Sequence, residues 1–148
     1  MAVREPEPAA VNAEDAPVLD ANRAFYAALE SRDAGRMDAL WSHGEDVACV
    51  HPGWHRLDGW EEIARSWRAI FANSRRWRVQ PAEERAFVSG EIAVVLCVEV
   101  LEVSGGSGTP ARMQATNVFR REEGVWRMVH HHASAMPEPG EEEEEPIN

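Results

Sequence analysis

The run IAVVLCVEVLEV (Ile92–Val103) opens the stretch that decides the fold, which extends to Ser134. It is rich in β-branched residues and is followed by the turn sequence SGGSGTP, so it predicts a long strand. A second strand is predicted at Met113–Arg121 and a third at Val125–Ser134, because the sequence EEG between them is a typical hairpin turn. The three strands form an antiparallel meander, which needs a covering layer on one face.

The residues before the meander predict the helices that supply this layer. Val18–Arg32 places apolar residues at helical spacing, and Asp33 can cap a short second helix. A short strand, Asp46–His51, precedes a third helix that starts near Asp58 and has a regular apolar face. Two weaker strands follow, broken at Pro81. This order predicts an α+β domain with its helices on one face of a bent sheet.

The length of 148 residues fits one domain, and the charge of −11 is concentrated at the two ends. Ten of the 26 acidic residues and one of the fifteen basic ones lie in residues 1–17 and 138–148, which leaves the rest nearly neutral. We expect a flexible tail at 1–15, a domain at 16–136 and an acidic disordered tail at 137–148. The arginines are scattered rather than clustered, so nucleic-acid binding is not expected.

Neither a signal peptide nor a run long enough to cross a membrane is recognisable, which predicts a cytoplasmic protein with no membrane partner. Cys49 and Cys97 fall inside predicted strands and outside any CxxC spacing. We expect buried free thiols, with a single disulfide as the alternative.

Two local patterns resemble known proteins. Residues 117–134 (NVFRREEGVWRMVHHHAS) are similar to the closing hairpin of the association domain of calcium/calmodulin-dependent kinase II, and Asp46–Pro52 resembles the strand of ketosteroid isomerase that ends in its catalytic Asp-Pro. With the element order over Val18–Ala135, these patterns indicate a resemblance to the NTF2-like superfamily, which includes the SnoaL-like polyketide cyclases. The resemblance implies an NTF2-like cone, in which a strongly bent antiparallel sheet carries three helices on its concave face and encloses an apolar pocket.

The resemblance also implies candidate catalytic residues. His51 stands where the isomerase has its general base, and Asn117 stands where it has a protonated Asp that donates to the oxyanion. The catalytic Tyr of the isomerase falls on Phe25, and Tyr26 lies about 100° around the helix. An imidazole suits proton transfer near neutrality and an amide can donate to an oxyanion. The alternative for His51 is that it only caps its strand.

Ligand contacts are expected from Phe25, Trp54, Trp67 and His131, although tryptophans in a small domain are more often core residues. Comparison with the relatives turns Val129, His131 and Ala133 toward the pocket and places the alternate residues Trp126, Met128, His130 and His132 on the outer face, an assignment that a β-bulge would reverse.

The run His130-His131-His132 also raises a zinc site, since two histidines at i and i+2 share a face. A catalytic zinc site needs a third protein ligand, and none has suitable spacing. We therefore expect no metal.

Two functions remain open. The first is a cofactor-independent isomerase, cyclase or hydratase that binds a small apolar or aromatic ligand and uses His51 as base, with Asn117 and His131 orienting the substrate. The second is a non-catalytic module that binds a ligand or oligomerises, as the kinase association domain does. In both, a homodimer through the outer face of the sheet is expected.

Overall fold

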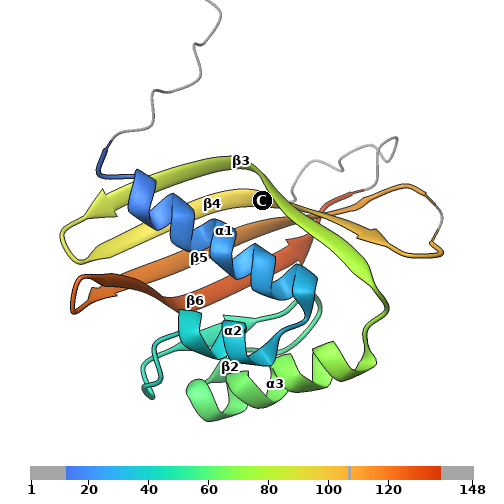
Figure 1. Ribbon diagram of the computed structural model, residues 1–148, viewed down its shortest axis with the longest axis horizontal. Coiled ribbons are helices and arrows are strands. Elements are labelled where there is room, and N and C mark those ends of the chain that lie inside the picture. Colours follow the sequence, from blue (N-terminus) through green and yellow to red (C-terminus); the bar gives the residue numbers. More distant parts are fainter. Residues whose placement is uncertain (1–12, 107, 138–148) are drawn as a thin grey trace, which may run out of the picture.

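The computed structural model describes residues 13–106 and 108–137, and these form three helices and a six-stranded sheet (Figure 1). The tails predicted at 1–15 and 137–148 lie almost entirely outside the described residues. The elements follow one another as α1 (Ala16–Ser31), α2 (Ala34–Leu40), β1 (Ala48–Val50), β2 (Leu57–Asp58), α3 (Trp60–Asn73), β3 (Trp77–Ser89), β4 (Ile92–Val103), β5 (Ala111–Glu122) and β6 (Val125–Ala135).

The helices begin and end at the signals present in the sequence. A proline occupies the first turn of α1, and Arg32 ends that helix in the left-handed region with φ of 53°. The Asp33 side chain caps α2 by accepting a hydrogen bond from the backbone N–H of Arg36 at 3.0 Å. Helix α3 turns Ile63 and Trp67 toward the interior, as its apolar spacing predicts, and Ser66 beside them is buried as well.

The sheet has the strand order β2-β1-β6-β5-β4-β3, and α1 crosses its concave face while α2 and α3 lie near β1 and β2 (Figure 1). The predicted α+β fold, with three helices on the concave face of a bent sheet, is confirmed. One detail differs, because β1 pairs in parallel with β6 and the sheet is therefore mixed. Residue periodicity identifies a strand but carries no information about which distant strand it will pair with.

Strand β3 is continuous, so the predicted break at Pro81 is wrong. Its pairing with β4 shifts register between Ala82 and Arg85, and Glu83 adopts a positive φ of 53° there. Because β3 is an edge strand, a proline without an N–H is accommodated in it, and a bulge absorbs the extra residues.

A second irregularity lies in β6, where Val118 pairs with His130 but its neighbour Phe119 pairs with Met128. Val129 is therefore the extra residue of a bulge. Met128 and, two residues earlier, Trp126 face inward and are buried, so their predicted place on the outer face is wrong. Beyond the bulge the prediction holds, because His131 and Ala133 are buried while His132 is exposed.

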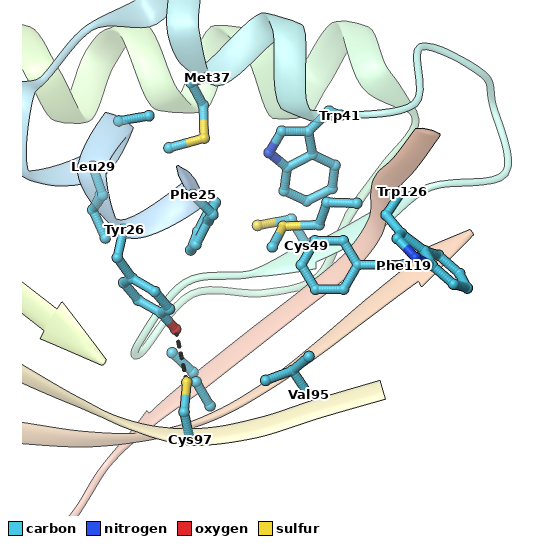
Figure 2. Close-up of a cluster of buried hydrophobic side chains, with 14 of the residues drawn as sticks. Phe25, Tyr26, Leu29, Met37, Trp41, Cys49, Val95, Cys97, Phe119 and Trp126 are labelled. Carbon is cyan, nitrogen blue, oxygen red and sulfur yellow. Dashed lines mark hydrogen bonds between the residues drawn. The ribbon is translucent and has the colours of Figure 1, made fainter. Parts of the chain in front are cut away.

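The hydrophobic core fills the space between the helices and the concave face of the sheet (Figure 2). Its largest fully buried side chains come from both layers, among them Phe25, Met37, Trp41, Phe119 and Met128. Cys49 and Cys97 are buried free thiols, as predicted. Among the helices of the described residues, none has the length and hydropathy needed to span a membrane.

Candidate functional site

A cavity of about 160 Å³ lies between α1, α3 and the sheet, toward the end where β4 and β5 leave the core. This volume is comparable to that of a cavity of about 150 Å³ that holds one benzene molecule. Three polar side chains reach it: His51, Glu99 and His131. Its apolar walls include Trp54, Trp67, Ile70, Trp77, Val79 and Leu101.

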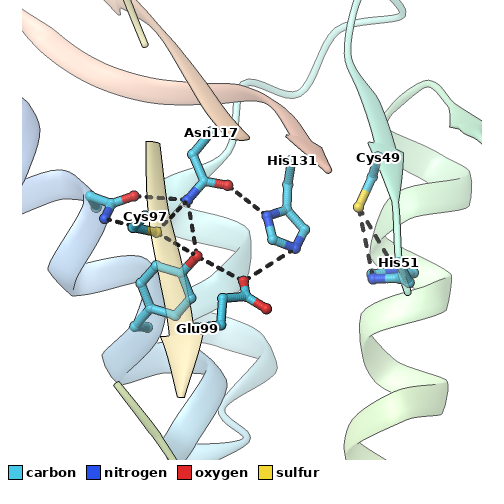
Figure 3. Close-up of polar contacts among 8 residues, drawn as sticks. Cys49, His51, Cys97, Glu99, Asn117 and His131 are labelled. Atoms are coloured by element: carbon cyan, nitrogen blue, oxygen red, sulfur yellow. Dashed lines mark hydrogen bonds and ion pairs between the residues drawn. The ribbon is translucent and has the colours of Figure 1, made fainter. Parts of the chain in front are cut away.

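His51 follows β1 and is only 3% exposed, so its hydrogen bonds fix its tautomer. Its Nε2 lies 2.8 Å from Oγ of Ser66, and the same Oγ lies 2.7 Å from the carbonyl oxygen of Ile63, to which it donates. A hydroxyl has one hydrogen, so both bonds form together only if His51 Nε2 donates to Ser66. The lone pair of the imidazole is then on Nδ1, whose polar neighbour is the buried Cys49 Sγ at 3.9 Å (Figure 3). The edge of the ring packs on Trp54 and Trp67.

A network of hydrogen-bonded polar side chains lies behind the cavity. The donor and acceptor of each bond can be assigned by starting from Glu84, whose carboxylate accepts hydrogen bonds. The Glu84 carboxylate pairs with Arg23 and accepts a hydrogen bond from Nδ2 of Asn22 at 3.0 Å. Asn22 Oδ1 therefore accepts from Nδ2 of Asn117 at 2.8 Å, and this Nδ2 also donates to the Tyr26 hydroxyl at 3.1 Å. Both amides are fully buried, so their orientations are determined by these partners.

This chain of hydrogen bonds sets the tautomer of His131 (Figure 3). Asn117 Oδ1 can only accept, and it lies 2.6 Å from Nδ1 of His131, which therefore donates. The lone pair of His131 is left on Nε2, 3.8 Å from Oε2 of Glu99. The same Oε2 accepts a hydrogen bond from the Tyr26 hydroxyl at 2.7 Å.

Burial shifts the pKa of all three polar groups of the cavity in the direction that favours the neutral form. It lowers the pKa of His51 to about 4 and that of His131 to about 3, the latter assisted by the neighbouring histidines. Burial also raises the pKa of Glu99 to about 7, against the opposing effect of the hydrogen bond from Tyr26. At neutral pH both imidazoles are uncharged, so His131 and Glu99 do not form an ion pair, and Glu99 is near its titration midpoint.

Four of the six site residues predicted from the sequence meet at the cavity: His51, Trp54, Trp67 and His131. Trp54 is 45% exposed and lies at the mouth, whereas Trp67 is buried in the wall. Their rings lie close to one another, with centroids of His51 and His131 6.4 Å apart.

The other two predicted residues lie one layer behind the cavity. Phe25 is fully buried and packs against His131 with ring centroids 4.8 Å apart. Asn117 holds His131 from behind, and both of its amide hydrogens are used by Asn22 and Tyr26. The geometry therefore gives Asn117 a role in orienting His131 and leaves no donor of this amide for an oxyanion in the cavity.

Sequence reasoning missed Glu99, Tyr26, Asn22 and Ser66. Glu99 is the one charged residue in the inward-facing series Ala93, Val95, Cys97 and Glu99, and a lone carboxylate in that series was a usable signal. Tyr26 was discounted for its position on the helix, yet its hydroxyl contacts Glu99, Asn117 and Cys97. For Asn22 and Ser66, a polar residue on an otherwise apolar helix face was the only sign.

Within residues 13–106 and 108–137, no three His, Cys, Asp or Glu side chains are grouped in a way that could hold a metal ion. His130 and His132 share the outer face of β6, with ring centroids 6.0 Å apart. The arrangement at the cavity instead suits binding of a compact, largely apolar molecule and transfer of its protons.

Comparison with known proteins finds relatives that share the fold over most of the chain. A protein-family model described as a SnoaL-like domain matches residues 18–139. A provisionally assigned dehydratase of the NTF2-like family from Streptomyces avermitilis is 36% identical, and its structure has a TM-score of 0.76 over 82% of this chain and 95% of that one. The match thus covers nearly the whole of both folds.

Two further relatives have different roles in their descriptions. A provisionally assigned association domain of calcium/calmodulin-dependent protein kinase type II from Thiobacillus denitrificans is 36% identical, with a TM-score of 0.74 over 88% of this chain and 100% of that one. F-box protein SKIP8 of Arabidopsis thaliana is 29% identical over 119 residues, which are 80% of this chain and 49% of that protein. The chain thus spans about half the length of this curated relative.

Proposed function

The chain belongs to the SnoaL-like domain family, and on that premise we propose that it binds a small molecule in the cavity and catalyses proton transfer on it, with His51 as the general base. The observation that carries this proposal is the tautomer of His51. Its Nε2–H is held by Ser66, which leaves the Nδ1 lone pair on a buried, uncharged imidazole beside the cavity. A base needs this combination of fixed position and available lone pair.

Glu99 supplies the complementary group. With its pKa raised to about 7, a substantial fraction of this carboxyl is protonated at neutral pH and can act as an acid. Two titratable groups whose environments keep one as a base and the other as an acid are a typical arrangement for proton transfer. In this scheme His131 contacts the substrate, and Asn117 holds His131 in position from behind.

Dehydration of a β-hydroxy carbonyl compound is the reaction that these groups fit best. His51 takes a proton from the carbon next to the carbonyl, and Glu99 gives its proton to the departing hydroxyl. One C–H and one C–O bond are replaced by a C=C bond and a water molecule, and the proton on His51 returns to Glu99 to restore the starting state. On a β,γ-unsaturated carbonyl compound, the same groups would catalyse isomerisation: His51 removes the α-proton and returns it to the γ-carbon, so that the C=C bond moves to the α,β position. The description of the Streptomyces avermitilis relative as a dehydratase supports the first form.

The volume of the cavity limits the substrate. About 160 Å³ accommodates one six-membered ring with small substituents and is too small for a fused multi-ring skeleton in this conformation. The tryptophans in the wall favour a planar or apolar ring.

The test uses 3-hydroxycyclohexanone, a β-hydroxy ketone of this size, in D₂O. Proton NMR follows deuterium uptake next to the carbonyl and the formation of cyclohexenone. We expect the wild type to accelerate both, and His51→Ala to lose about 100-fold or more of the acceleration because a positioned general base contributes on that order.

His55→Ala is the matched control, because His55 is an exposed histidine four residues away on the same loop. It should retain wild-type rates, and thermal unfolding should show that both variants are folded. Equal exchange by the wild type and His51→Ala would remove His51 from the mechanism. No acceleration by the wild type would leave a binding protein without this chemistry.

A second candidate function is self-association through the outer face of the sheet. Val94, Leu96, Val98 and Val100 alternate with the inward residues of β4 and form an apolar row on that face, and Phe87 beside them on β3 is 48% exposed. Apolar area of this kind is typical of an interface. The 36% identity to a protein described as a kinase association domain supports it. Both functions can operate together, because the cavity opens on the opposite side of the sheet.

A further inference from the structure

The polar atoms around the cavity have an unusual imbalance between donors and acceptors. His51 presents a lone pair on Nδ1 and His131 presents one on Nε2, as their partners Ser66 and Asn117 require. Glu99 contributes a carboxyl group whose Oε2 already accepts from Tyr26. Two of the three groups are therefore acceptors only, and the third donates only when it is protonated.

The side-chain donors nearest to His131 and Glu99 are already in use. Asn117 Nδ2 donates to Asn22 and Tyr26, and the Tyr26 hydroxyl donates to Glu99. In the cavity wall, Trp77 Nε1 donates to the carbonyl oxygen of Leu29 at 2.8 Å, whereas the buried Nε1 of Trp67 has no partner among the described residues. No arginine occurs among the cavity-lining residues in the described part of the chain. His131 Nε2 and Glu99 Oε2 are 3.8 Å apart, which is too long for a direct hydrogen bond and leaves the buried lone pair of His131 without a donor.

We propose that the space beside His131 Nε2 and Glu99 binds the hydroxyl group of a small neutral alcohol or phenol. The hydroxyl donates to His131 Nε2 and accepts from the protonated carboxyl of Glu99. This proposal rests on the proposed function, in which the cavity binds the substrate. It identifies the substrate as an alcohol or phenol and its hydroxyl as the group that receives the proton from Glu99.

A neutral ligand fits better than a charged one. His131 is 2% exposed and Glu99 6%, and their surroundings disfavour charge on either. A carboxylate ligand would face the lone pairs of both groups without a cation to balance it. An ammonium ligand would have to form a buried ion pair with Glu99, for which the loss of hydration offsets much of the attraction.

The hydrogen bond that Glu99 donates to the ligand hydroxyl makes binding depend on pH, because only the protonated carboxyl can donate it. Titratable groups lie around this carboxyl on the neighbouring elements: Tyr26 on α1, Cys97 on β4, Cys49 on β1, His51 after β1 and His131 on β6. Glu84 on β3 is connected to it indirectly, through Asn22, Asn117 and Tyr26. Burial lowers the pKa of both histidines and raises that of Tyr26 and both thiols, so Glu99 is the group of the cavity that titrates between pH 6 and 8. Affinity should be constant below its pKa and fall toward tenfold per pH unit above it.

The experiment measures binding by tryptophan fluorescence with four probes that share one ring, and free tryptophan titrated with each probe corrects for absorption and non-specific quenching by the probe. These are cyclohexanol, cyclohexanone, cyclohexylammonium and cyclohexanecarboxylate. At pH 6 we expect cyclohexanol to bind about tenfold tighter than each of the others. Between pH 6 and 8.5 its affinity for the wild type should fall by about tenfold or more.

Two substitutions at position 99 separate hydrogen bonding from folding. Glu99→Gln keeps a neutral donor at every pH, so it should bind cyclohexanol within about threefold of the wild type at pH 6 and lose the pH dependence. Glu99→Leu should lose about tenfold of the cyclohexanol affinity and the pH dependence, while a preference for cyclohexanol over cyclohexanone remains because His131 Nε2 still accepts from the hydroxyl. Glu102→Gln, at an exposed position on the same strand, is the control and should retain the wild-type profile.

Tighter binding of either charged probe, pH-independent binding to the wild type, or no saturable binding of cyclohexanol would each overturn the proposal. These outcomes are independent of turnover. If His51→Ala proves catalytically unaffected, the proposed general base fails while the hydroxyl site is still tested by its pH profile in the wild type and in Glu99→Gln.

Discussion

Replacing Glu99 by glutamine should make the stability of the protein less sensitive to alkaline pH. The folded protein holds the Glu99 proton with a pKa of about 7 against an ordinary value of 4.5, because the carboxyl is buried. Between these two values the folded state binds more protons than the unfolded state, so stability falls as pH rises through this window. The shift corresponds to about 3 kcal/mol at pH 8, at about 1.4 kcal/mol for each pKa unit.

Glutamine removes this penalty and can still accept the hydrogen bond from Tyr26, which is 2.7 Å from Oε2 in the native protein. We expect the difference in unfolding free energy between Glu99→Gln and the wild type to increase by about 3 kcal/mol from pH 4.5 to pH 8, with most of the change below pH 7.5. The histidine contributions are common to both proteins and cancel in the difference.

The assay is urea denaturation at half-unit steps of pH, followed by the fluorescence of the six tryptophans. Glu102→Gln, on the exposed end of the same strand, should give a difference that hardly changes with pH. A constant difference for Glu99→Gln across the whole range, within about 0.5 kcal/mol, would show that Glu99 is not shifted by burial and would refute the reasoning.

Three other substitutions test separate parts of the structure. Met128→Asp puts a carboxylate at a position with no exposure, so we expect loss of several kcal/mol and an unfolded or insoluble protein by circular dichroism, rather than a folded monomer. Leu96→Glu on the outer face should keep the fold but give monomers by light scattering, whereas Ala24→Glu on the exposed side of α1 should leave the assembly unchanged. Tyr26→Phe removes the hydrogen bond that lowers the pKa of Glu99, so the loss of cyclohexanol affinity should move to higher pH in the same titration.

The sequence was sufficient to predict the layers of the fold because each element carries a local signal. The meander follows from β-branched residues between glycine-rich turns, and the inward face of α3 follows from its apolar spacing. The parallel pairing of β1 with β6 could not be predicted in the same way, because it joins residues about eighty positions apart. The bulge at Val129 could not be predicted either. One extra residue reverses which side chains of β6 face the core on one side of the bulge, and the residue types along the strand do not indicate it.

The candidate site was only half predictable for a related reason. His51 and His131 stand out because an imidazole is rare in an apolar strand, and both reach the cavity. Glu99 was overlooked because both faces of β4 are apolar over most of its length, so alternation alone does not say which face is inside. Phe25 and Tyr26 point about 100° apart on α1, yet both are buried because the sheet and the other helices cover a wide part of that helix. Their positions on the helix therefore did not reveal that Tyr26, rather than Phe25, contacts Glu99.

The two edge strands of the sheet, β3 and β2, are poorly suited to pair with a strand of another chain. Strand β3 is a thirteen-residue edge strand, but its Val79 N–H donates to Glu30 at 3.1 Å, Pro81 has no N–H, and the bulge at Glu83 interrupts the regular strand. At the opposite margin β2 has only two residues. Neither edge presents a straight row of donors and acceptors on which a foreign strand could be templated. Growth of this sheet into a fibril is thereby obstructed at both edges, even though β4 between them presents an apolar row on the outer face.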